Sequence, residues 1–371
     1  MICLCFFARQ IVPLASAKET GGIFLLVCDP GGTTMKKSFA GIAASLLLAG
    51  VLTVAGCGGP EQTAEVKPKN GLTVYTSVYN GMVKQMAEPV VKQQLKEVDV
   101  DWRTAGSENV KAKLFDEMRQ GKAEADLVMI SDPSFYLQLK KDGKLLNYKS
   151  PQAAELAEAV DADGAFTPIR VSAMVIAVNR DKVQDIPKSW KDLLDPKYKG
   201  KIAMPNPKVA ATALATVAAL KDKYGWEYWQ QLKDNGVIVS PTMEMRDKFS
   251  RGEYPITITM EEDVLKQKQS QNVNAEVVYP EEGSVLLPGY IGILKDTKNP
   301  GDAKKLVDWW LSDEGQSAMS LAFMHPVKFG VKEPVGSRGL IELRIHSLPV
   351  NWNKLMAEEK QVKEKFAEIM K

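Results

Sequence analysis

The chain has 371 residues, of which 45% are hydrophobic and 25% charged, with a formal net charge of +2. This length predicts two domains or lobes, and the composition excludes a fibrous, disordered or membrane-embedded protein. A balanced charge provides no basic field, so we expect no nucleic-acid partner. No cysteine follows Cys57, which excludes a disulfide framework, a thiol nucleophile and a thiolate metal site from the rest of the chain.

Residues 35–56 have the features of a lipoprotein signal peptide. Met35-Lys36-Lys37 precedes an apolar run, and Val54-Ala55-Gly56-Cys57 resembles the bacterial lipobox. In that pathway the chain is cut before Cys57 and the cysteine sulfur is acylated, so we expect a lipid-anchored protein in the cell envelope, facing the periplasm or the exterior. The alternatives are a plain signal with an incidental cysteine, or a transmembrane anchor, for which the run is shorter than the required ~20 residues.

Two further segments flank this signal. Residues 1–34 fit no part of it, and Gly31-Gly32 can be encoded by a ribosome-binding sequence upstream of a start at Met35. We therefore interpret residues 1–34 as an artefactual extension. Residues 57–69 are mostly Gly, Pro, Glu, Gln, Thr and Lys, and are predicted to form a flexible tether.

Beyond the tether, short apolar strands alternate with amphipathic helices, which predicts an α/β fold. A first set has strands at 72–75, 98–102 and 125–130 and helices at 82–96 and 110–120. A second set has strands at 201–204 and 255–259 and helices at 211–222 and 226–234. Extended runs at 171–178 and 285–294, the latter broken by Pro288-Gly289, flank the second set, and helices at 302–311 and 353–370 follow.

The order of these elements predicts two α/β lobes joined by two crossing strands. Residues 70–170 and 295–371 would form the first lobe, and residues 171–294 the second lobe with the crossing strands. Parallel strands place ligands at their carboxyl ends, so we expect the site between the lobes.

A series of short motifs has the order and spacing of a known family over residues 72–371. They are Val74-Tyr75-Thr76-Ser77, Ala105-Gly106-Ser107-Glu108-Asn109, Ala125-Asp126-Leu127-Val128, Gly143-Lys144-Leu145-Leu146, Ala177-Val178-Asn179, Leu193-Leu194-Asp195-Pro196, Asn206-Pro207, His325-Pro326-Val327 and Pro349-Val350-Asn351-Trp352. The chain resembles the type II periplasmic-binding-protein family, in the branch of ferric-ion, sugar-phosphate and 2-aminoethylphosphonate binders.

The resemblance implies a function in solute uptake. It implies a monomeric binding lipoprotein of an ABC importer, which closes on a small molecule and delivers it to permease and ATPase subunits. No cofactor or resident metal is implied. A sensory or interaction module on the same fold is the alternative from another functional class.

Loops before helices supply the candidate ligand contacts. Thr76, Ser77 and Asn80 precede the first helix, Gly106 and Ser107 the second, and Thr212 lies in the first helix of the second lobe. Free N–H groups at helix starts favour anions, although Ser, Thr and Asn are also common helix caps. The anion-binding relatives tend to have Ser-Gly-Thr where this chain has Ala210-Ala211-Thr212, which weakens a phosphate site on the second lobe.

Charged residues supply the remaining candidates. Arg170 is interpreted as a compensating oxyanion donor or as a surface ion-pair residue. Glu261, Glu262 and Asp263 follow the strand at 255–259, where ferric-ion binders carry a tyrosine pair that is absent here. These carboxylates are predicted to contact an ammonium group, hydroxyls or a hard metal ion, or to be an acidic helix start. Asp132, after the third strand, is a further candidate.

We expect the protein not to be an enzyme. His325 and His346 are the only histidines, and no triad, zinc, phosphate-loop or dinucleotide-binding motif occurs. The predicted ligand is a small phosphorylated or phosphonate compound with an amine or hydroxyls. Ferric iron or another metal is the first alternative, and a polyamine is the second.

Overall fold

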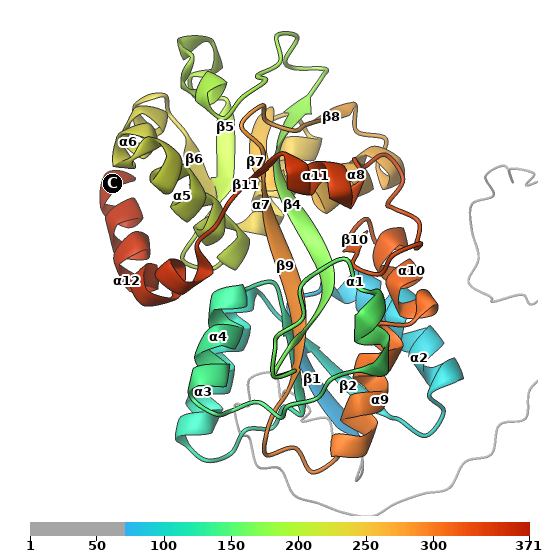
Figure 1. Cartoon of the computed structure of the whole chain (residues 1–371). Helices are drawn as coiled ribbons and strands as arrows, with labels where there is room; N and C mark the ends of the chain where they lie inside the picture. Colours follow the sequence, from blue (N-terminus) through green and yellow to red (C-terminus); the bar gives the residue numbers. More distant parts are fainter. Residues whose placement is uncertain (1–70) are drawn as a thin grey trace, which may run out of the picture. The chain divides into compact units, whose positions relative to one another are not determined.

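The computed structural model describes residues 71–371, drawn in colour in Figure 1. The predictions for the start codon, the signal peptide, Cys57 and the tether concern residues outside this range. None of the helices in the described part of the chain is both long and apolar enough to cross a bilayer.

The first lobe is built on a parallel sheet. Its strands β1 (Leu72–Thr76), β2 (Val100–Thr104) and β3 (Leu127–Ile130) lie in the order β2-β1-β3. The helical segments are α1 (Asn80–Met82), a π-helical turn (Val83–Ala87), α2 (Glu88–Gln94), α3 (Ser107–Arg119) and α4 (Pro133–Lys141). Alternate residues face opposite sides of this sheet. Val74 and Met129 pack with the helices on one side, and Tyr75 and Val128 pack on the other.

Two long antiparallel strands join the lobes. They are β4 (Thr167–Asn179), which is buried along its whole length, and β9 (Ser284–Ile293). Pro288-Gly289 was predicted to break β9, but the strand is continuous there. One edge of β9 pairs with β4. On the other edge, β11 pairs only with the start of β9 and β3 only with its end, so within residues 71–371 no strand pairs with that edge near Pro288. A proline without an N–H group is tolerated at such an edge.

The second lobe continues the same sheet. Its strands are β5 (Ile202–Pro205), β6 (Ile238–Ser240), β7 (Ile256–Met260) and β8 (Ala275–Val278), with β4-β7-β5-β6 as the order of the path and β8 paired to β4. Its helices are α5 (Ala211–Tyr224), α6 (Trp226–Asp234), α7 (Thr242–Ser250) and α8 (Glu261–Ser270).

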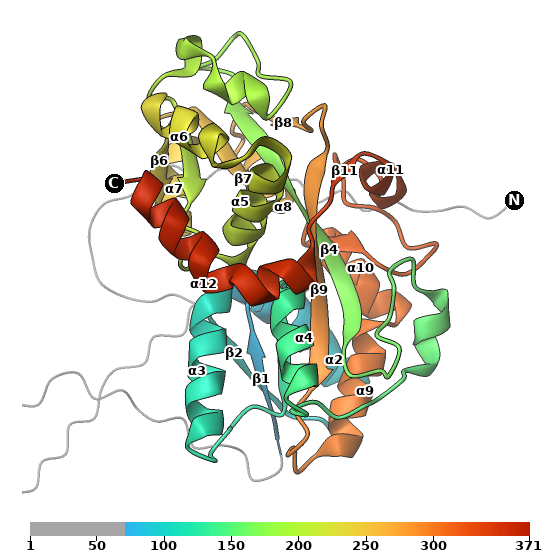
Figure 2. The ribbon, with the colours of Figure 1, turned by 60° about the vertical axis from the view of Figure 1, so that its left-hand side comes forward.

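The last part of the chain contacts both lobes. It contains α9 (Pro300–Trp310), α10 (Asp313–Leu321), β10 (His325–Pro326), α11 (Leu340–Ile345), β11 (Ser347–Leu348) and α12 (Trp352–Ile369). The sequence interpretation placed all of 295–371 in the first lobe. In the structure α9 and α10 pack there, but α12 buries Leu355, Val362 and Phe366 in the core of the second lobe. Figure 2 shows α12 lying beside α5 and above α3 and α4.

Candidate functional site

A cavity of about 320 Å³ lies between the lobes, at the carboxyl ends of β1, β2 and β3. The first lobe lines it with Ser77, Val78, Tyr79, Asn80, Thr104, Ala105, Gly106, Ser107, Ser131 and Arg170. The second lobe lines it with Val209, Ala210, Thr212, Thr242, Met243, Arg246, Met260 and Glu262. Residues from both lobes therefore enclose one volume of the size of a small organic molecule.

Several helices begin at this cavity without a side-chain cap. The N-cap residues of α3, α5, α7 and α8 are Gly106, Ala210, Pro241 and Met260, and none of these makes a side-chain capping hydrogen bond. One first-turn N–H group has a partner from the other lobe, since Ala211 N donates to Ser107 Oγ at 3.2 Å. The uncapped starts of α3, α5 and α7 direct N–H donors and positive dipole ends at the same space, which suits an anion, whereas α8 begins with three carboxylates of its own.

Arg170 and Glu262 form a buried pair at the wall of the cavity. Their side chains approach to 3.4 Å between Nη1 and Oε1, and Ser172 Oγ donates to the same carboxylate oxygen at 2.9 Å. Burial raises the pKa of Glu262 to about 7; the Arg170 charge opposes this rise, and the nearby Asp263 adds to it. Burial therefore favours the neutral form of Glu262 more than for an exposed carboxyl group.

Arg246 brings a second guanidinium group to the cavity from α7. It forms an ion pair with Asp263, whose other oxygen accepts from Thr259 Oγ1 at 3.2 Å. Burial lowers the pKa of Arg246, but the Asp263 charge outweighs burial and the net shift is upward. Its Nε atom is buried and has no hydrogen-bond partner among residues 71–371. Arg246 therefore brings an unsatisfied buried donor to the wall of the cavity.

Comparison with known proteins identifies the family. Residues 123–355 match the family described as bacterial extracellular solute-binding protein. The chain belongs to this family.

Two relatives and one solved structure describe the kind of solute-binding protein that this chain is similar to. A probable ABC transporter periplasmic-binding protein of Sinorhizobium fredii is 24% identical over 65% of this chain and 72% of its own length. A putative 2-aminoethylphosphonate-binding periplasmic protein of Salmonella typhimurium is 25% identical over 55% of this chain and 63% of its own. The periplasmic binding protein AfuA of Actinobacillus pleuropneumoniae, solved with exogenous fructose-6-phosphate, is 24% identical, with a TM-score of 0.72 over 82% of this chain and 99% of its own. These similarities agree with the two-lobed type II periplasmic-binding-protein fold.

The predicted site residues of this solute-binding protein divide into two groups. Those that line the cavity are Ser77, Asn80, Gly106, Ser107, Arg170, Thr212 and Glu262. Those that do not line it are Thr76, Asp132, Glu261 and Asp263. Thr76 Oγ1 donates to Met129 O at 2.8 Å, which holds the ends of β1 and β3 together.

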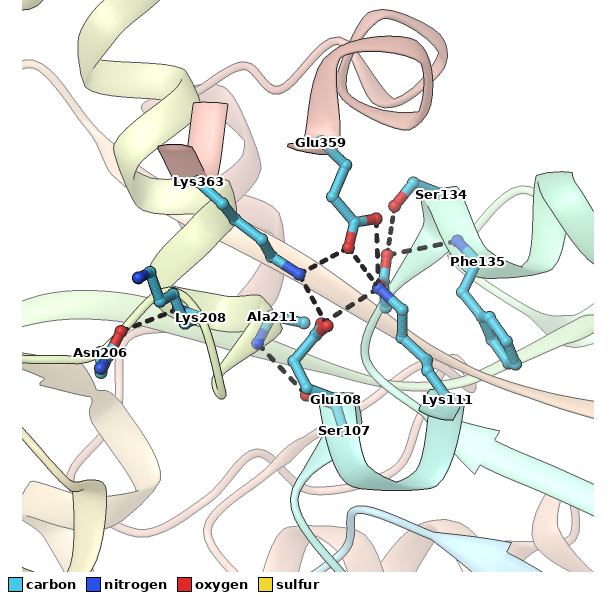
Figure 3. Close-up of polar contacts among 11 residues, drawn as sticks. Ser107, Glu108, Lys111, Ser134, Phe135, Asn206, Lys208, Ala211, Glu359 and Lys363 are labelled. Carbon is cyan, nitrogen blue, oxygen red and sulfur yellow. Dashed lines mark hydrogen bonds and ion pairs between the residues drawn. The ribbon is translucent and has the colours of Figure 1, made fainter. Parts of the chain in front are cut away.

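The acidic residues outside the cavity have partners in the protein. Asp132 caps α4 and pairs with the buried Lys111 at 2.8 Å, in the cluster that Figure 3 shows around Lys111. Glu261 faces away from the cavity and pairs with His325 Nε2 at 2.6 Å. Burial lowers the pKa of His325, but hydrogen bonds to Glu261 and Glu333 outweigh it and raise the pKa to about 9. Of the three acidic residues at the start of α8, only Glu262 therefore lines the cavity.

Sequence reasoning missed Tyr79, Ser131 and Arg246. Arg246 lies on α7, which was not predicted, although Ser240-Pro241-Thr242 is a recognisable strand-to-helix junction. Tyr79 adds an aromatic wall, and its hydroxyl donates to Ala322 O at 2.8 Å. No group of three or more His, Cys, Asp or Glu side chains within residues 71–371 is arranged to hold a metal ion.

Proposed function

We propose that the chain is the capture subunit of an ABC importer, which binds a small phosphorylated or phosphonate solute between its lobes. One observation supports this proposal. The uncapped starts of α3 and α5, the side chains of Arg170 and Arg246, and Ser131 with its buried hydroxyl all lie at one cavity between the lobes. Such donors stabilise an oxyanion and leave no reacting group in place, which favours binding over catalysis.

The same proposal covers the position of the protein in the cell. Acylation at Cys57 would anchor the chain as a monomer at the outer side of the membrane, beside the permease and its ATPase. The neighbouring genes distinguish import from the alternative role as a sensory module. Permease and ATPase genes favour import, and a sensor-kinase gene favours signalling.

A thermal-shift screen tests the class of solute. Phosphonates, sugar phosphates, ferric iron and polyamines are each added to the purified domain. A bound ligand at a hundred times its Kd stabilises the folded state by about 2.7 kcal/mol, which raises the melting temperature by roughly 5 °C. We expect this rise for an oxyanion, and a rise only with iron or polyamines would contradict the proposal.

A solute that also carries an amine is supported by Glu262. Its carboxylate lines the cavity beside Arg170, so an oxyanion and an ammonium group would find different partners in one site. Replacing Glu262 with Gln should weaken an amine-bearing ligand more than tenfold, because a buried charge pair is lost. A sugar phosphate without an amine should lose less, since the Gln amide still accepts from a hydroxyl.

A further inference from the structure

Ser131 has a side chain that the folded chain leaves unsatisfied. It follows β3 directly, is 4% exposed and lines the interlobe cavity. Its Oγ atom is buried and has no hydrogen-bond partner among residues 71–371. A buried hydroxyl without a partner is destabilising, and such groups in native proteins call for a reason. Ser131 lines the cavity, so a rotation of its side chain toward the cavity lets a bound group supply the missing partner.

Gly289 brings the Ser131 hydroxyl close to the guanidinium of Arg170. In the β4–β9 ladder Gly289 lies opposite Arg170. A Cβ atom at Gly289 would be 2.9 Å from Ser131 Oγ and 3.0 Å from Arg170 Nε. Both polar atoms therefore lie against the same backbone position, and both belong to residues that line the cavity. Glycine is required there because any side chain would displace them.

We propose that Ser131 is a specificity-determining residue, whose hydroxyl donates a hydrogen bond to an oxyanion oxygen of the solute while Arg170 binds the same group. This inference rests on the proposed function and adds a residue to it. A solute without an acceptor at this point would leave the hydroxyl unpaired in the complex. Unpaired buried polar groups discriminate strongly between related ligands. Ser131 thus selects for the oxyanion of the solute, whereas Glu262 would select for an amine elsewhere on the same solute.

Replacing Ser131 with Ala tests this role, and Ser284 provides a matched control. Ser284 is 2% exposed, and its Oγ is also buried without a partner within residues 71–371, but it does not line the cavity. Both Ala variants remove an unsatisfied hydroxyl, so neither should melt below the wild type. Affinity for methylphosphonate and glucose 6-phosphate is then measured by calorimetry. We expect Ser131→Ala to bind about tenfold or more weakly, and Ser284→Ala to bind like the wild type.

The possible outcomes separate this inference from the proposed function. If the wild type binds either compound and Ser131→Ala binds it equally well, Ser131 does not contact the solute. A lower melting temperature for Ser131→Ala would assign the hydroxyl a structural role and also overturn the inference. If neither compound binds the wild type at millimolar concentration, the oxyanion assignment itself fails, and the inference fails with it.

Discussion

Glu262 combines burial, an ion pair and a place in the cavity wall. It is 3% exposed, and its carboxylate faces Arg170 and Ser172. Its pKa rises from 4.5 to about 7, chiefly because burial disfavours the charged form. Between these two pH values the folded protein binds more protons than the unfolded chain. The free energy of unfolding therefore falls as the pH rises through this window.

The Glu262→Gln variant should lack this dependence, because Gln does not titrate. Relative to the variant, the wild type should lose about 3 kcal/mol of stability as the pH rises from below 4.5 to above 7. Denaturant unfolding of both proteins on either side of the window measures the difference. Parallel stability profiles for the two proteins would mean that Glu262 does not titrate abnormally.

At the residue scale, sequence reasoning found the cavity residues that stand directly before or at helix starts, such as Asn80, Gly106 and Thr212. It could not separate Ser131 from Asp132, since adjacent residues at a strand end point in different directions and the direction depends on tertiary packing. The acidic triplet presented the same difficulty. Successive helix positions face different sides, so Glu261 turns to His325 and Glu262 to the cavity.

Helix α12 connects the two lobes. Its apolar face is buried in the second lobe, while Glu359 and Lys363 on another face reach α3 of the first lobe. Glu359 contacts Lys111 Nζ at 2.9 Å, and Lys363 contacts Glu108 at 2.7 Å. Burial lowers the pKa of Lys111, but three nearby carboxylates outweigh it and raise the pKa. Because α3 begins at the cavity, these ion pairs stabilise the arrangement of the two lobes around the cavity.

Replacing Glu359 with Gln should weaken solute binding without touching the cavity. Loss of one partly buried ion pair between the lobes costs about 1 kcal/mol, which corresponds to roughly fivefold in affinity. Glu358→Gln is the control, because Glu358 pairs with Lys221 of α5 inside the second lobe at 3.2 Å. Calorimetry should show weaker solute binding for Glu359→Gln and unchanged binding for Glu358→Gln. Equal affinities of the two variants would mean that the ion pair of Glu359 with the first lobe does not support solute binding.

The sequence indicated α12 as a helix by its apolar periodicity, but it did not indicate its lobe. An amphipathic pattern shows that one face is buried and does not show against which partner. Here the apolar face packs against α5 and α6 of the second lobe while α12 also lies against α4 of the first lobe, so the last segment contacts both lobes. Element α7 was missed because Met243, Met245 and Phe249 are too few to establish a helical period over such a short segment.

At the scale of the whole molecule, length and the two extended runs were sufficient to predict two lobes and two crossings. The proposed lipid anchor at Cys57 would hold this molecule at a membrane through a short tether. Cys57→Ser should leave the protein unacylated and release it from the membrane fraction, while the solute affinity of the domain stays the same. Cell fractionation with and without globomycin-type inhibition of signal cleavage measures this. A Cys57→Ser protein that still sediments with membranes would contradict the lipid anchor.

We expect a small oxyanion to bind between the lobes. A crystal structure with the phosphonate or sugar phosphate that stabilises the protein most tests it directly. We expect the oxyanion at the starts of α3 and α5, within hydrogen-bonding distance of Ser131 and Arg170, and any amine of the solute beside Glu262. A solute bound outside the interlobe cavity, or an oxyanion that contacts neither Ser131 nor Arg170, would show that this cavity is not an oxyanion site.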